Sequence, residues 1–103
     1  MEKIYIHARL KLRIGGYDEF CEAIKAQVPV LEKHGWKLVG AWTSVVGQIC
    51  TVIDLWELPD ANTFFDALAL WRGSPELARF REVTTKVVIE EEIQMMRKVP
   101  YSP

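Results

Sequence analysis

Three side chains of this chain have the types that proton transfer and anion binding require. His7 and Arg9 lie two positions apart near the N-terminus, and Asp54 interrupts an otherwise apolar segment. An imidazole can move a proton, and a carboxylate can orient the imidazole or act as the base itself. A guanidinium can hold an enolate or a carboxylate. We therefore take His7, Asp54 and Arg9 as the candidate catalytic residues.

Large aromatic side chains could form the walls of a binding site around this chemistry. Three of the four tryptophans fall in the segment from Gly35 to Pro59. The candidate substrate-binding residues are Tyr5, Trp42, Trp56 and Trp71. Together these residues predict a site for a small, partly aromatic organic molecule.

The same residues also have purely structural explanations. His7 and Asp54 would serve equally as a hydrogen-bonded pair inside a dimer interface, and Arg9 as an ion-pair partner of Glu90 or Glu92. Large aromatic residues pack in cores and interfaces more often than they stack on ligands. The alternative to an enzyme is therefore a homodimer that binds a small molecule or serves assembly without catalysis.

Composition and motifs restrict the possible partners. The 103 residues carry 13 Lys and Arg against 14 Asp and Glu, so neither nucleic acid nor an anionic membrane surface is expected as a partner. No apolar run approaches the roughly 20 residues that span a bilayer. Cys21 and Cys50 are far apart, as expected for free thiols in the cytoplasm. No zinc, phosphate-loop or dinucleotide motif occurs, so we expect no metal and no cofactor.

Periodicity predicts the elements that position these residues. Apolar and polar side chains alternate from Lys3 to Ile14, which is typical of a strand with one apolar and one basic face. A helix capped by Asp18 follows, with apolar residues at helical spacing. A hairpin of two strands comes next, about Trp36 to Val45 and about Gln48 to Leu58. A second helix, which Asp60 or Asn62 can cap, is followed by a third that restarts at Ser74-Pro75 with Ser74 as its cap. A last strand from about Val88 to Val99 completes the chain.

This order predicts an α+β fold of the ferredoxin-like, split βαβ type, formed as one domain over residues 1–103. Its four-stranded antiparallel sheet would carry helices on one face only. An uncovered sheet face of this size needs a partner in a soluble protein. A homodimer that packs two sheets face to face is the simplest solution.

Strand parity sorts the side chains onto the two faces, provided that no β-bulge intervenes. The face predicted to meet the helices collects Ile4, Ile6, Ala8, Leu10, Ile49, Thr51, Ile53, Leu55, Ile93 and Met95. The opposite face collects Tyr5, His7, Arg9, Lys11, Cys50, Val52, Asp54, Trp56, Glu90, Glu92 and Gln94. Parity therefore places Asp54 beside His7 on the uncovered face.

The hairpin also carries a family resemblance. HGWKLVGAW, from His34 to Trp42, and DLWEL, from Asp54 to Leu58, resemble paired strands of the NIPSNAP family, which has K-L-x-G-x-W in one strand and H-L-W in the next. The resemblance covers most of the chain and implies a dimeric α+β barrel. Relatives of that barrel type include cofactor-independent monooxygenases and small-molecule lyases or cyclases, so the resemblance implies a cofactor-independent oxygenation, isomerisation or cyclisation as the candidate reaction. Asp54 stands where the family usually has histidine. Proteins of this barrel type usually hold ligands between the sheet and the helices, which conflicts with the parity assignment of the candidate site.

Overall fold

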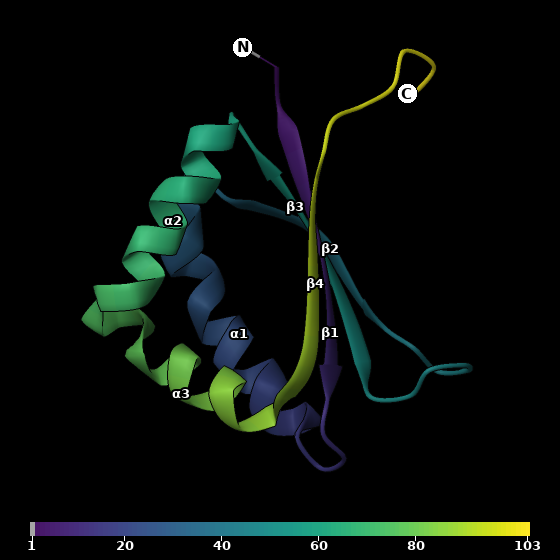
Figure 1. Ribbon diagram of the computed structural model, residues 1–103, viewed down its shortest axis with the longest axis vertical. Coiled ribbons are helices and arrows are strands. Elements are labelled where there is room, and N and C mark those ends of the chain that lie inside the picture. Colours follow the sequence, from purple (N-terminus) through teal and green to yellow (C-terminus); the bar gives the residue numbers. More distant parts are fainter. Residues whose placement is uncertain (1) are drawn as a thin grey trace.

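The computed structural model describes residues 2–103 and shows a four-stranded antiparallel sheet with helices on one side of it (Figure 1). The predicted order of strands and helices is confirmed, with a 3-10 turn added before the last helix. The elements are β1 (Ile4–Leu12), α1 (Tyr17–Lys33), β2 (Lys37–Thr43), β3 (Thr51–Leu58), α2 (Ala61–Gly73), η1 (Pro75–Leu77), α3 (Ala78–Val87) and β4 (Val88–Met96).

The first strand lies at the centre of the sheet, whose strand order is β2-β3-β1-β4. Ile6, Ala8, Leu10 and Leu12 alternate with polar residues and are all buried, which confirms the predicted apolar face of β1. This row faces the helices, because it packs with residues of α1 and α3 in one core cluster. A second cluster joins β1 and β3 to α1, α2 and the residue before β2.

The starts of two helices test the predicted caps. Asp60 caps α2 as predicted, because its carboxylate accepts a 2.9 Å hydrogen bond from the Thr63 backbone N–H. That bond and a second one from the Thr63 hydroxyl lower the pKa of the Asp60 carboxyl. The predicted cap at Asp18 is wrong: α1 begins at Tyr17, and Asp18 lies in its first turn.

The hairpin strands are shorter than predicted, and β3 has the opposite parity to the one predicted. The loop spans residues 44–50 and contains Gly47 and Cys50 with positive φ of 98° and 58°. In β3 itself, Asp54 pairs with Ala8 and Trp56 with Ile6, and both lie on the helix-covered face.

The parity prediction is therefore correct for two strands and wrong for the third. On β4, Ile93 pairs with Ala8 on the helix side and Glu92 pairs with Arg9 on the uncovered side, as predicted. On β3 the helix-facing row is Val52, Asp54, Trp56 and Leu58, which are all buried. The predicted helix-facing row, with Ile53 and Leu55, instead lies on the uncovered face.

Candidate functional site

A cavity of about 220 Å³ lies between the helices and the sheet and is partly open to solvent. For comparison, an apolar cavity of about 150 Å³ is large enough to bind benzene. Its walls come from α1, α2, η1, α3 and three strands of the sheet. The lining residues are Ala8, Leu10, Phe20, Ile24, Gln27, Leu31, Trp36, Asp54, Trp56, Phe64, Ala67, Leu68, Trp71, Leu77, Phe80, Thr84, Glu91 and Ile93.

Asp54 is the buried acid of this cavity. It is 4% exposed and lies on β3 opposite Ala8, whose small side chain leaves space beside the carboxylate. Burial raises the pKa of the Asp54 carboxyl to about 6, and no ion pair or hydrogen bond among the described residues offsets that desolvation. A carboxylate of this kind is ionised at neutral pH and more basic than an ordinary aspartate, as a general base requires.

Two residues that line the same cavity each carry a buried hydrogen-bond donor without a partner. They are the side-chain amide nitrogen of Gln27 (Nε2) and the indole nitrogen of Trp36 (Nε1), which are both buried and find no acceptor among the described residues. Gln27 is 4% exposed and lies on α1. Leaving one buried donor unsatisfied costs about 1–3 kcal/mol. Such groups are rare in folded proteins, and each calls for an explanation, which a bound acceptor would supply.

Aromatic rings form much of the remaining wall. Trp36 meets Trp56 edge to face with ring centroids 5.6 Å apart, and its centroid lies 5.9 Å from that of Phe64. Trp71 meets Phe80 in a similar edge contact at 5.3 Å. Contacts of this type hold rings in fixed orientations. The cavity is therefore suited to a planar organic ring.

A second acid lies at the rim of the cavity. Glu91 pairs with Leu10 across β4 and β1, so it shares the helix-covered face with Asp54. The residue as a whole is exposed, yet its carboxyl group is partly desolvated, and this raises its pKa. The cavity thus has one buried acid and one acid at its mouth.

The structure separates the predicted catalytic residues. Asp54 lines the cavity, whereas His7 and Arg9 lie on the uncovered face of β1. The predicted role of Asp54 as a partner of His7 is wrong, because side chains of opposite parity point to opposite faces of a sheet. Arg9 forms a 3.3 Å ion pair with Glu92, which is the structural alternative expected for it.

The predicted substrate-binding residues are also divided between the two faces of the sheet. Trp56 and Trp71 line the cavity. Tyr5 lies on the uncovered face, where its hydroxyl donates a 3.3 Å hydrogen bond to Glu57. Trp42 also lies there and covers Gly40, where an added Cβ would come within 2.7 Å of the indole.

Sequence reasoning missed several residues of the cavity, above all Gln27 and Trp36. For Gln27 a signal existed: it continues the helical row of Phe20, Ile24 and Leu31, so a polar amide stands on an apolar stripe. Trp36 precedes β2, and only the folded hairpin brings it against Trp56.

Two further features concern the described residues as a whole. No group of three or more histidine, cysteine, aspartate or glutamate side chains among residues 2–103 is arranged to hold a metal ion. Within the same range, none of the helices is both long and apolar enough to cross a membrane.

Comparisons with known proteins agree with this fold. The family model described as NIPSNAP matches residues 5–103. A NIPSNAP family protein of unknown function from Agrobacterium tumefaciens superposes with a TM-score of 0.84 at 17% identity, over 99% of this chain and 93% of that chain. An uncharacterized NIPSNAP-like domain protein from Burkholderia xenovorans gives 0.78 at 23% identity, over 99% and 90%.

The fold also occurs outside that family. A candidate antibiotic biosynthesis monooxygenase from Bacteroides thetaiotaomicron superposes with a TM-score of 0.69 at 14% identity, over 99% of this chain and 92% of that chain. None of the curated proteins compared with the chain matches it. The architecture is the ferredoxin-like, split βαβ fold, and because the family model matches nearly the whole length, the chain belongs to the NIPSNAP family.

Proposed function

We propose that the cavity between the helices and the sheet binds a small, partly aromatic organic molecule, and that Asp54 acts on it as a general base. The observation that carries this proposal is the buried Asp54 carboxylate, which faces an aromatic-walled cavity with nothing among the described residues to neutralise it. Keeping an ionised group there disfavours the folded state. Acids whose pKa is raised by burial in a cavity cluster at functional sites.

Proton removal suits the reaction types expected for this chain. Oxygenation, isomerisation and cyclisation of a carbonyl compound can each begin with loss of a proton from carbon, and a positioned base accelerates that step. The likeness to the Bacteroides protein is one of fold and adds only that this architecture occurs in a candidate monooxygenase. The base assigned to the reaction is Asp54, in place of the His7, Arg9 and Asp54 group expected from the sequence.

Filling the cavity is expected to abolish ligand binding. Ala67 lines the cavity on α2, whereas Ala69 lies on the exposed side of the same helix, so Ala67→Phe and Ala69→Phe form a matched pair. We expect calorimetric titration with 2-naphthol to show binding to the wild-type protein and to A69F, and at least ten-fold weaker binding to A67F. Equal affinity in the two variants, or no binding to the wild type, would contradict the proposal.

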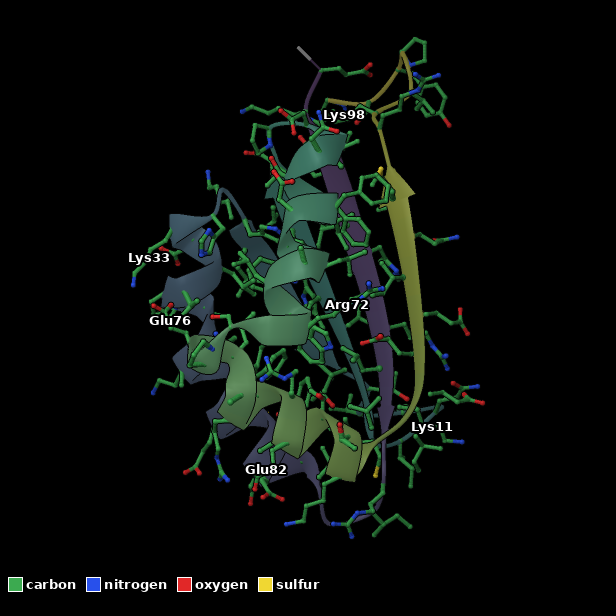
Figure 2. All side chains as sticks on the ribbon, turned by 60° about the vertical axis from the view of Figure 1, so that its left-hand side comes forward. Lys11, Lys33, Arg72, Glu76, Glu82 and Lys98 are labelled. Atoms are coloured by element: carbon green, nitrogen blue, oxygen red, sulfur yellow. The ribbon has the colours of Figure 1, made fainter. Side chains whose placement is uncertain are left out.

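The uncovered sheet face supports a second part of the proposal, that the protein works as a homodimer. This face carries apolar side chains together with charges of both signs; its members include Arg9, Lys11, Trp42, Ile53, Leu55, Glu90 and Glu92. Figure 2 shows Lys11 on the side of the sheet away from the helices. A two-fold interface must be self-complementary, and a face that mixes basic and acidic strands meets that condition. Two such sheets would pack about 10 Å apart.

Trp42 is the expected anchor of this interface. It is 57% exposed on the uncovered face, and Phe65, 58% exposed on α2, is a control of matched exposure on the other side. We expect W42E to raise the dimer dissociation constant by at least about 30-fold, because loss of an interface anchor costs about 2 kcal/mol or more. Sedimentation velocity over a micromolar dilution series should show dimers for the wild type and F65E. A wild-type monomer, or a dimer unaffected by W42E, would refute this interface.

A further inference from the structure

The unpaired groups of the cavity allow the substrate to be described more closely. Asp54 supplies a base, while Gln27 Nε2 and Trp36 Nε1 supply hydrogen-bond donors that have no acceptor among the described residues. We propose that the substrate is an enolisable carbonyl compound, whose oxygen accepts from Gln27 and Trp36 while Asp54 removes the proton from the neighbouring carbon. This inference rests on the proposed function and adds the chemical class to it.

Two neutral donors and one anionic base on residues of the same cavity define the polarity of the ligand. A carbonyl oxygen accepts the hydrogen bonds that the amide and indole N–H groups offer, and it becomes a better acceptor as negative charge develops on it. An organic cation would also suit a carboxylate among aromatic rings. It would leave both N–H groups of Gln27 and Trp36 without an acceptor, so the donors favour the carbonyl compound.

The reaction step is balanced without any further reactant. The Asp54 carboxylate takes the proton from the carbon next to the carbonyl group, the electron pair of that C–H bond forms the new C=C bond, and the π pair of C=O moves to oxygen. The resulting enolate oxygen is held by Gln27 and Trp36. Asp54, now a neutral carboxylic acid, either passes the proton to another carbon of the conjugated system, or exchanges it with water at the open side of the cavity and returns a solvent proton to the original carbon. The net result is exchange or isomerisation, with no change in oxidation level.

The environment of Asp54 supports both halves of this cycle. Because burial raises the pKa of its carboxyl to about 6, the group accepts a proton more readily than an ordinary aspartate and still releases it near neutral pH.

The test uses 2-tetralone, a bicyclic ketone with acidic C–H groups next to its carbonyl. In D2O buffer at pH 7, proton NMR should show that the wild-type protein accelerates exchange of these hydrogens at least ten-fold over buffer. Asp54→Asn should remove the acceleration, whereas Glu57→Gln should keep it, because Glu57 lies on the same strand but on the opposite face. Exchange by D54N at the wild-type rate would overturn the inference.

A second variant tests the donors separately from the base. Gln27→Met keeps the length of the side chain and removes the N–H group, so we expect exchange to slow ten-fold or more while the protein stays folded. An unchanged rate in Q27M would remove Gln27 from the site.

Binding of 2-naphthol, which resembles the enol of 2-tetralone, separates this inference from the proposed function. If 2-naphthol binds in the cavity and 2-tetralone does not exchange, the enolisation inference fails while the binding site remains. If phenethylamine binds in the cavity in preference to 2-naphthol, the site recognises an organic cation and the carbonyl class is wrong. If neither ligand binds, both the inference and the proposed function fail.

Discussion

Replacing Asp54 with asparagine is expected to make the protein more stable at neutral pH while it loses its base. Burial raises the pKa of the Asp54 carboxyl from 3.8 to about 6 in the folded protein. Such a shift corresponds to roughly 2–3 kcal/mol that the ionised carboxylate costs the folded state at pH 7. Asparagine has nearly the same shape and no charge, so D54N avoids this cost.

The direction of the stability change follows from the pH at which Asp54 ionises in the unfolded and in the folded state. As pH rises from about 4 to about 6, the unfolded chain releases the Asp54 proton before the folded protein does. Ionisation in that window therefore favours unfolding, and the contribution of Asp54 to stability falls with rising pH and levels off above the folded pKa. Well below pH 3.8 the acid is protonated in both states and the penalty is absent.

Urea unfolding of the wild type and D54N at matched protein concentration measures the difference directly. We expect their free energies of unfolding to agree well below pH 3.8 and to diverge up to about pH 6, with D54N higher. E57Q serves as the control acid-to-amide change, because Glu57 is paired on the uncovered face. Parallel curves for the wild type and D54N from pH 4 to 7 would show that Asp54 is not desolvated.

Removing the Phe20 ring is expected to have the largest effect on stability. Phe20 is 1% exposed on α1, where it packs in the core cluster between β1 and α3 and its ring centroid lies 6.4 Å from that of Phe80. Truncating a buried phenylalanine to alanine costs about 3–5 kcal/mol. Domains of this size have only about 5–15 kcal/mol of stability in total. F20A is therefore expected to be marginally folded at 25 °C.

Phe65→Ala is the matched control for this change. Phe65 is 58% exposed, and its main aromatic contact is with Phe64 at 5.4 Å between ring centroids. We expect F65A to lose less than about 1 kcal/mol, as surface substitutions generally do. Denaturant midpoints measured side by side compare the two. Similar losses in F20A and F65A would contradict the packing of the helices on this face of the sheet.

The sequence predicted the fold well in strands whose two faces differ in polarity. In β1 every second residue from Ile6 to Leu12 is apolar and the intervening ones are polar, so only one orientation buries the apolar row. The family motif in the hairpin identified the same architecture independently. Asp60 and Ser74 marked the helix starts because their side chains accept hydrogen bonds from the first turn.

The candidate site was harder to predict because β3 has two apolar rows. Thr51, Ile53 and Leu55 look as suitable for a core as Val52, Trp56 and Leu58, and the buried row also contains the charge of Asp54. The polarity of the side chains therefore favoured the wrong row of β3 as the one that faces the helices. Cys50 lies in the loop directly before β3 and has a positive φ, which the alternation of side chains within the strand does not predict.

The two expected effects of D54N belong together. Asp54 lowers the stability of the folded protein at neutral pH, so its presence in the cavity is best explained by a function in that cavity. Gain of stability together with loss of 2-tetralone exchange would give Asp54 a chemical role. Gain of stability without loss of exchange would leave the residue desolvated but chemically idle.

Resonances of the four tryptophan indole N–H groups provide the most direct test of where the ligand binds. In a proton–nitrogen NMR titration with 2-naphthol, the Trp36 indole signal should shift strongly, because its buried Nε1 gains an acceptor. The Trp42 signal, from the uncovered face, should stay in place. A Trp42 signal that shifts while Trp36 stays fixed, or four unchanged signals at saturating 2-naphthol, would contradict a binding site between the helices and the sheet.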